Sequence, residues 1–344
     1  MTRAPGLDGF AMPAEWALHR ATWLAWPHER TDWPGKFTPI PWVYGEMVRV
    51  LSRHERVAIL VENALEEKRA RAVLKKAGAS LERIDFYRIP TDRSWVRDSG
   101  PIFVTNKQGD KIATRWKFNA WAKYPNHKRD ARVASRIATI AGVKEYAATA
   151  NGEDVVMEGG ALDVDGTGNL IATEECLLSG VQARNPDLGR ADIERILWEA
   201  LGARRVIWLG RGIAGDDTHG HIDDVARFIA PGVVLLCEEK NSKDENYAAL
   251  EENRERLEGA GIDVVRLPMP EPVVFNNQRL PASYANFYIA NEVVIVPTFN
   301  DSKDRRALGT IAEFFPERQV AGIHCGDLVW GLGTLHCATQ QEPV

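Results

Sequence analysis

Patterns of buried strands and amphipathic helices alternate along this chain of 344 residues. Residues 56–61 (RVAILV) form an apolar run that predicts a buried strand, and residues 64–77 have the Lys/Glu/Arg-rich pattern of an amphipathic helix. A unit then recurs, in which a two-stranded hairpin is followed by a helix and a third strand. The expected hairpins pair 101–105 with 112–118, 161–164 with 170–173, 225–230 with 233–238, and 284–289 with 293–298.

This unit repeats at a spacing of roughly 60 residues, longer than that of common solenoid repeats. Expected helices cover 129–142, 190–202, 243–260 and 303–314, and expected third strands cover 205–209, 264–268 and 320–325. Strands near 22–26, 56–61 and 83–87 would complete about five units. Because no Pro/Ser-rich linker interrupts the pattern, we expect an α/β fold in which residues 1–344 form a single domain, with the units closed into a ring.

The amino-acid composition argues against several classes of protein. The chain is 44% hydrophobic and 26% charged, with a net charge of −5, which is typical of a globular protein and disfavours a nucleic-acid binder. No apolar stretch approaches the roughly 18 residues of a membrane span, and the start has no secretory signal. Four cysteines without C-x-x-C spacing indicate a reducing, cytoplasmic compartment and no cysteine zinc site. The acidic balance suits a small cationic ligand.

Polar clusters occupy one recurring place, just before the first strand of each hairpin. They are WVRDSG (95–100), MEGG (157–160), HGHIDD (219–224), PASYAN (281–286) and TLHC (334–337). Equivalent positions in a ring of repeated units converge on its axis. The five clusters therefore predict one shared site.

Cys337 is the candidate nucleophile in this site. It follows His336 and precedes a polar run, and a thiolate is a good nucleophile when a cation or base stabilises it. Cys325 also follows a histidine, but it ends an apolar strand and is interpreted as structural. Cys176 and Cys237 lie in apolar runs and are expected in the core.

The HGHIDD segment supports two interpretations. Asp217, His219, His221 and Asp223 alternate along an extended segment, as in a metal site of a metal-dependent ureohydrolase. Alternatively, His221 is a general acid/base with Asp223 as a carboxylate partner or ligand-binding group. The absence of a second Asp/His-dense segment favours the interpretation without a metal.

Asp98 and Glu158 add carboxylates beside glycines, and Trp95 could stack on a planar cation. Carboxylates pair with a guanidinium through planar, bidentate hydrogen bonds. Together with a histidine and a cysteine, these residues describe a guanidinium site. The aromatic segment 118–124 (FNAWAKY) either lines this pocket or belongs to the core.

The ordered motifs resemble the agmatine deiminase and bacterial-type peptidylarginine deiminase family, within the guanidino-modifying pentein superfamily. The resemblance covers nearly the whole chain through MPAEW, ATWLAWPH, SWVRDSGP, KFNAW, EGGALDVDGTG, HGHIDD, SYANFYIAN and HCATQQEP. It implies a five-bladed α/β propeller with pseudo-fivefold symmetry and no metal or organic cofactor.

The resemblance also implies residue roles. Cys337 would attack the guanidinium carbon to form a covalent thiouronium, and His221 would protonate ammonia and then activate water. Asp98 and Asp223 would hold the guanidinium nitrogens, while Trp95, Glu158 and Asn286 would contribute to substrate binding.

Agmatine is the favoured substrate, with N-carbamoylputrescine and ammonia as products. Peptidylarginine or free arginine remain alternatives, because the segments after FNAW and before Cys337 depart from the family pattern. Arg115 and Arg129 flank the first of these segments and could bind a carboxylate. A homo-oligomer, and a propeller that only binds a partner, also stay open.

Overall fold

Four three-stranded sheets repeat one pattern of strand pairing. In a computed structural model, which describes residues 3–344, each has an antiparallel hairpin whose second strand pairs in parallel with a third strand. These sheets are β4 (Ile102–Thr105), β5 (Lys111–Arg115) and β6 (Lys144–Ala147); β9 (Asp163–Val164), β10 (Asn169–Thr173) and β11 (Arg205–Leu209); β12 (Ala226–Ala230), β13 (Val233–Glu238) and β14 (Asp263–Pro268); and β17 (Tyr288–Ile289), β18 (Val293–Thr298) and β19 (Gln319–His324). The predicted repeat of hairpin, helix and strand is confirmed in these four sheets.

A fifth sheet joins the two ends of the chain. Its order is β20 (Thr339–Pro343), β1 (His19–Ala25), β2 (Val57–Val61) and β3 (Ile84–Arg88). β20 runs antiparallel to β1, whereas β1, β2 and β3 are parallel. The hairpin partner of β1 therefore comes from the C-terminal part of the sequence. Within residues 3–344 the sheets remain separate and do not form a closed barrel.

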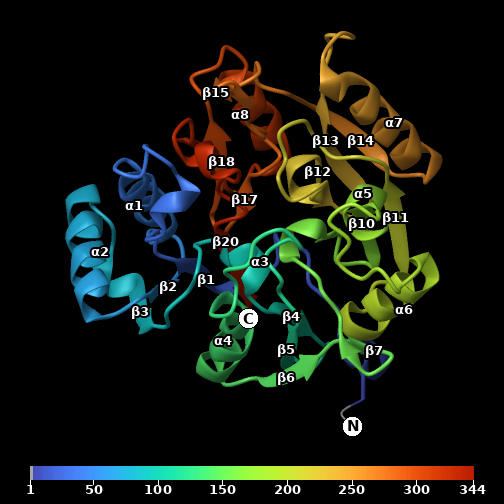
Figure 1. Cartoon of the computed structure of the whole chain (residues 1–344), viewed down its shortest axis with the longest axis horizontal. Helices are drawn as coiled ribbons and strands as arrows, with labels where there is room; N and C mark the ends of the chain where they lie inside the picture. Colours follow the sequence, from blue (N-terminus) through green and yellow to red (C-terminus); the bar gives the residue numbers. More distant parts are fainter. Residues whose placement is uncertain (1–2) are drawn as a thin grey trace.

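Helices connect the parallel strands and cover the outside of the sheets (Figure 1). The connecting helices are α1 (Ile40–Leu51), α2 (Ala64–Ala77), α4 (Val133–Ala141), α6 (Arg190–Leu201), α7 (Glu245–Gly259) and α8 (Asp304–Phe314). Two further helices are short, α3 (Val96–Ser99) and α5 (Glu174–Leu177). Two small hairpins pair β7 (Thr149–Ala150) with β8 (Glu153–Asp154) and β15 (Val274–Phe275) with β16 (Gln278–Arg279). Figure 1 places α3 and β20 near the centre, with the four three-stranded sheets and strands β1, β2 and β3 of the fifth sheet around them. None of the helices in residues 3–344 is long and apolar enough to cross a membrane.

Helix α2 illustrates how local sequence sets an element. The Asn63 side chain accepts hydrogen bonds from the backbone N–H groups of Leu65 and Glu66, and so caps the helix start. The helix ends at Gly78, whose φ of 80° lies in the left-handed region that terminates helices. The predicted helix 64–77 is therefore confirmed with both ends.

Two expected first strands are shorter than predicted. The strand expected at 161–164 pairs only at Asp163–Val164, and the one expected at 284–289 pairs only at Tyr288–Ile289. The residues that precede these strands make hydrogen bonds outside the sheets. Gly160 N–H donates to Asp98, and the Ser283 hydroxyl donates to the carbonyl of Asp224. The polar clusters therefore lie in irregular segments, which frees their side chains to point toward the centre.

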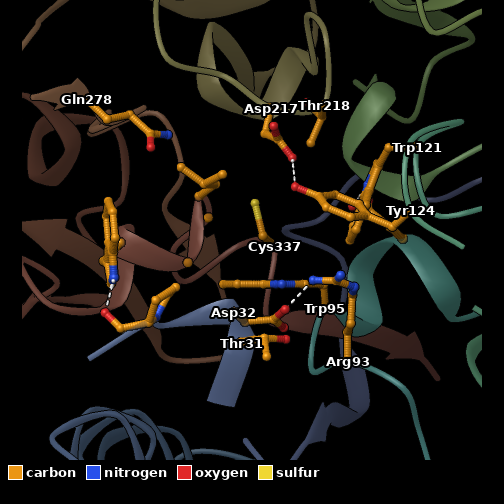
Figure 2. A pocket seen from close by; sticks show the side chains of 16 residues that line it. Thr31, Asp32, Arg93, Trp95, Trp121, Tyr124, Asp217, Thr218, Gln278 and Cys337 are labelled. Carbon is orange, nitrogen blue, oxygen red and sulfur yellow. Dashed lines mark hydrogen bonds and ion pairs between the residues drawn. The ribbon is translucent and has the colours of Figure 1, made fainter. Parts of the chain in front are cut away.

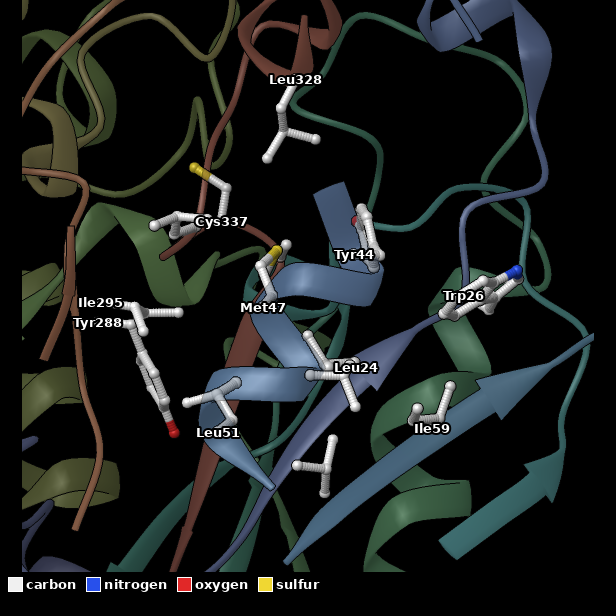
Figure 3. Packing of buried hydrophobic residues seen from close by; sticks show 14 of the residues in the cluster. Leu24, Trp26, Tyr44, Met47, Leu51, Ile59, Tyr288, Ile295, Leu328 and Cys337 are labelled. Carbon is white, nitrogen blue, oxygen red and sulfur yellow. The ribbon is translucent and has the colours of Figure 1, made fainter. Parts of the chain in front are cut away.

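The largest apolar cluster lies beneath the nucleophile candidate. Leu24 and Ile59 of the fifth sheet pack with Met47 of α1, and the cluster extends to Ile295 of β18 and to Cys337 (Figure 3). Cys337 is therefore part of a close-packed core that also includes residues of two sheets.

Candidate active site

A cavity of about 370 Å³ opens at the place where the polar clusters meet. Its volume is in the range of small-molecule sites. Its walls are formed by Thr31, Asp32, Pro34, Arg93, Trp95, Asp98, Trp121, Tyr124, Asp217, Thr218, Gln278, Trp330, Gly331, Leu332, Gly333 and Cys337. Figure 2 shows Cys337 at the middle of this group, with Tyr124 and Asp217 on one side and Arg93 and Asp32 on another.

Asn286 fixes the segment that carries Cys337. Its side-chain oxygen accepts from the Thr334 hydroxyl at 2.7 Å and from the His336 N–H at 3.0 Å, and its amide donates to Cys337 Sγ at 3.1 Å. Burial and the carboxylates of Asp223, Asp224 and Asp98 raise the pKa of the Cys337 thiol well above its usual value. Without a cationic ligand the sulfur is therefore a thiol at neutral pH.

Asp98, on α3, is oriented by two donors. Trp121 Nε1–H donates to Oδ2 at 2.8 Å, and Gly160 N–H donates to Oδ1 at 2.9 Å. Burial raises the pKa of Asp98; His221 opposes this rise, and Asp223 adds to it. A cation beside Asp98 would favour its charged form, so the site has an electrostatic preference for positive ligands.

The donor Trp121 lies in an unusual backbone segment. Ala120, Trp121 and Ala122 have φ values of 52°, 59° and 54°, three successive left-handed residues. Non-glycine residues rarely adopt this conformation, and such strain concentrates at functional sites. Trp121 and Tyr124 of this segment form part of the cavity wall, while Phe118 and Ala120 belong to the apolar core, so FNAWAKY contributes to both.

His221 is surrounded by carboxylates. Its Nδ1 lies 3.9 Å from both Asp98 Oδ2 and Asp223 Oδ1, and its Nε2 lies 3.6 Å from Glu158 Oε2. Within residues 3–344 neither ring nitrogen has a hydrogen-bond partner. Burial acts to lower the pKa of His221, but Asp98 and Glu158 outweigh it and raise the pKa well above the usual value. The imidazole is therefore protonated at neutral pH and can act as a general acid.

Asp223 has one carboxylate oxygen that is hydrogen-bonded and one that is not. His336 Nδ1–H donates to its Oδ2 at 2.7 Å, and Cys337 Sγ lies 3.6 Å from the same oxygen. Its Oδ1 is buried and has no hydrogen-bond partner among residues 3–344. Burial acts to raise the pKa of Asp223, but His336 and His221 outweigh this and lower it. An ionised carboxylate with a free buried oxygen is suited to receive an N–H group of a ligand.

Glu158 and Asn286 lie behind the cavity wall. Arg184 Nε donates to both oxygens of Glu158 at 3.1 and 3.2 Å, and both side chains are fully buried. Burial acts to raise the pKa of Glu158, but Arg184 and His221 lower it. Glu158 therefore contacts His221, and Asn286 contacts Cys337, while Trp95 lines the cavity itself.

Several residues near the site were not assigned to it from sequence. Asp32 and Arg93 line the cavity, and Cys176 lies beside His221 and Glu158, within 4.8 Å of their ligand atoms. Asp217, which the sequence suggested only as a metal ligand, lines the cavity as well. The three cavity residues lie outside the strands and long helices, where hydrophobic periodicity gives no signal. Cys176 lies in an apolar run and belongs to a buried core cluster as expected, and it also lies beside the site.

Arg115 and Arg129, considered for carboxylate binding, lie elsewhere. Arg115 pairs with Glu145 and Asp154, and neither arginine is among the residues that line the cavity. Arg129 pairs with Glu62.

The HGHIDD run does not hold its four candidate ligands together. Asp217 accepts from the Tyr124 hydroxyl at 2.6 Å, whereas His219 Nε2 lies 3.3 Å from the Ser179 hydroxyl. Within residues 3–344 a single group of three ligand-type side chains is close enough for a metal, namely Glu158, Cys176 and His221. Because Arg184 already occupies both oxygens of Glu158, this group does not fit a cation well.

Comparisons with known proteins agree with this geometry. The family model of the Porphyromonas-type peptidyl-arginine deiminases matches residues 11–343. The chain is 36% identical to the agmatine deiminase of Ectopseudomonas mendocina, covering 100% of this chain and 98% of that protein.

Solved structures agree as well. The agmatine deiminase of Enterococcus faecalis has a TM-score of 0.91 at 32% identity, covering 100% of this chain and 98% of the other. A substrate-bound agmatine deiminase of C. jejuni has a TM-score of 0.87 at 28% identity, covering 97% and 96%. DDAH of Pseudomonas aeruginosa, with a TM-score of 0.50 at 14% identity and coverage of 94% and 100%, shares the mixed α/β fold. By sequence and structure, this chain belongs to the Porphyromonas-type peptidyl-arginine deiminase family.

Proposed function

We propose that this protein is an agmatine deiminase, which hydrolyses the guanidinium of agmatine to N-carbamoylputrescine and ammonia. The observation that carries the proposal is that Cys337 and Asp98 line one cavity with His221 and Asp223 packed directly behind them, and that Asp223 Oδ1 is buried without a hydrogen-bond partner among residues 3–344. The named agmatine deiminases among its relatives support the same activity.

The two carboxylates bind the head group in this proposal. Asp98 and Asp223 accept N–H groups of the guanidinium, and Trp95 covers its face. The positive charge of the ligand offsets the carboxylates that raise the pKa of Cys337. Ligand binding therefore favours loss of the thiol proton, and the thiolate is formed next to the carbon that it attacks.

The reaction then passes through two additions. The Cys337 thiolate adds to the guanidinium carbon, His221 gives its proton to the departing nitrogen, and ammonia leaves a covalent S-alkylthiouronium. The neutral His221 next takes a proton from water, and the resulting hydroxide adds to the same carbon. Collapse of this adduct breaks the C–S bond, the hydroxyl proton passes to the departing sulfur to restore the Cys337 thiol, and the ureido product is released.

The charges around the rest of the cavity favour an amine over a carboxylate on the substrate tail. Arg93, the one lining arginine, is paired with the lining carboxylate of Asp32. Asp217 adds a further lining carboxylate, and its partner Lys123 does not line the cavity. A free carboxylate, as in arginine, would find no unpaired guanidinium among the lining residues of the described chain. Agmatine is therefore the preferred substrate, and peptidylarginine or free arginine the second candidates.

The five sheets are proposed to form a five-bladed α/β propeller with a pseudo-fivefold axis through the site, as a single catalytic domain. The arrangement around a common centre in Figure 1 supports this. We also propose a cytoplasmic location, because all four cysteines are free.

Ammonia release from agmatine, arginine and an arginyl peptide, with and without EDTA, tests the function. Activity on agmatine that survives EDTA, with a ureido product, is expected. Urea release that EDTA abolishes would instead indicate a metal-dependent ureohydrolase. Silence with all three substrates would contradict the proposal and favour a partner-binding propeller.

A further inference from the structure

His336, the residue before the nucleophile, lies between two buried carboxylates. Its Nδ1 is 2.7 Å from Asp223 Oδ2, and its Nε2 is 2.8 Å from Glu15 Oε2. The side chain is 2% exposed and does not line the cavity. The mechanism above gives this histidine no role, although it touches a carboxylate that receives the substrate.

Both nitrogens of His336 must carry a proton for both contacts to be hydrogen bonds, because ionised carboxylates only accept. Both partners have cationic neighbours other than His336. Arg227 and Arg97 lie against Glu15 and favour its charged form, and His221 lies 3.9 Å from Asp223 Oδ1. The geometry is therefore that of a doubly protonated imidazole.

Glu15 is itself rigidly held. Arg227 Nη2 lies 2.8 Å from its Oε1, Arg97 Nη2 donates to its Oε2 at 3.2 Å, and the backbone N–H of Ile289 donates to Oε1 at 2.8 Å. Arg227 is also 3.5 Å from Asp163. Glu15 thus acts as a fixed anchor on the side of His336 that faces away from the substrate.

We propose that His336 is a positioning residue, an imidazolium that Glu15 holds against Asp223 so that this carboxylate stays ionised with Oδ1 turned toward the guanidinium. The proposal rests on the function proposed above, because it assigns Asp223 to substrate binding. The other groups that face Asp223 are His221, Cys337, Asp98, Asp224 and Arg227.

The charge state of His336 can be measured without any substrate. In enzyme labelled with ¹⁵N-histidine, the spectrum at pH 7.5 should contain an imidazole with both nitrogens protonated, and this signal should be missing from His336→Asn. A signal of a neutral, singly protonated ring assigned to His336 would overturn the proposal. This result stands whether or not the enzyme acts on agmatine.

Two variants separate the contacts of His336. In His336→Asn the amide nitrogen lies near the position of the histidine Nδ1 and can still donate to Asp223. In His336→Gln the amide nitrogen lies near the position of Nε2 and reaches Glu15 only. His336→Gln should lower kcat/KM by about 10- to 100-fold, the effect of losing one hydrogen bond to a charged group. His336→Asn should lose less.

The pH dependence of binding distinguishes positioning from a structural role. Agmatine affinity is measured by calorimetry in a Cys337→Ala background, where no thiol titrates. Asp98 titrates on the acid side of the binding profile, and loss of the neighbouring cation raises the pKa of Asp223 toward the same range. His336→Gln should therefore make the loss of agmatine affinity at acid pH steeper, because two carboxylates instead of one then release a proton on binding. An unchanged acid profile in a folded His336→Gln protein would overturn the proposal.

His19 offers the matched control. It is another buried histidine, but its Nε2 lies 2.7 Å from the backbone carbonyl of Glu15 rather than its carboxylate. His19→Gln should lower the melting temperature without changing the acid profile of binding. If wild-type enzyme did not turn over agmatine, the proposed function would fail, while the ¹⁵N spectrum would still decide the state of His336.

Discussion

Gly160 lies so close to the reacting groups that a single added methyl group tests the site. A Cβ at this position would lie 2.5 Å from His221 Nδ1, 3.0 Å from Asp98 Oδ1 and 3.1 Å from Asp223 Oδ2. The backbone of Gly160 is not in the left-handed region, so alanine itself is not strained there. The effect of Gly160→Ala must therefore arise from displacement of the site.

The size of this effect follows from the contact distances. Ordinary contacts between non-bonded heavy atoms begin near 3.5 Å, so His221 must move by about 1 Å to make room for the methyl group. A misplacement of about 1 Å can slow an enzyme about 100-fold. We therefore expect Gly160→Ala to lower kcat for agmatine by about 100-fold or more, with the protein still folded.

The assay is ammonia release coupled to glutamate dehydrogenase, with circular dichroism to verify folding. Gly309→Ala in α8 is the matched control, because no atom lies within 4 Å of a Cβ there. This helix substitution should leave kcat unchanged and stabilise the protein by about 0.5–1 kcal/mol. A folded Gly160→Ala enzyme with wild-type kcat would refute the placement of His221, Asp98 and Asp223 around one substrate.

Four further predictions follow from the same geometry. Cys337→Ser should abolish ammonia release while Cys325→Ser stays active, and the reverse pattern would reject the nucleophile. Arg184→Met strands a buried carboxylate and should lower the free energy of unfolding in urea by about 3–5 kcal/mol, whereas a change below 1 kcal/mol would argue against the pair. The pKa of Asp98 is raised, so this carboxylate takes up a proton at a pH above the ordinary carboxyl range. Agmatine affinity should therefore begin to fall at that higher pH as the solution is acidified, and calorimetry should show that Asp98→Asn removes this pH dependence. Asp217→Asn should raise KM for agmatine about tenfold, the equivalent of 1.4 kcal/mol, and an unchanged KM would place the amine elsewhere.

Sequence alone could predict the repeated unit and the groups at its centre because both depend on local patterns. Asp98 and His221 precede the first strand of their hairpins, so the repeat places them at equivalent positions. Cys337 lies at the matching place before β20, which pairs with β1. Convergence of these clusters is thus a property of the repeat.

The pocket beyond the guanidinium could not be predicted in this way. Asp32 and Arg93 are separated by 61 positions and meet through irregular loops. Arg184 pairs with Glu158 across 26 positions, and nothing in the local sequence of either residue indicates the partner. Such contacts depend on how loops pack on the finished sheets, and loop conformation has no periodic signal.

The pairing of β20 with β1 also determines when the enzyme becomes reactive during folding. Trp23 of β1 donates to Glu342 of β20 across 319 positions of sequence, so this sheet is completed through one of the longest loop closures the chain can make. Contacts between distant residues form slowly, because the entropy of loop closure must be overcome first. The segment that carries Cys337 leads directly into β20, so its position depends on this sheet as well as on Asn286. Partly folded chains therefore lack the assembled site, and the deiminase reaction requires the completed fifth sheet.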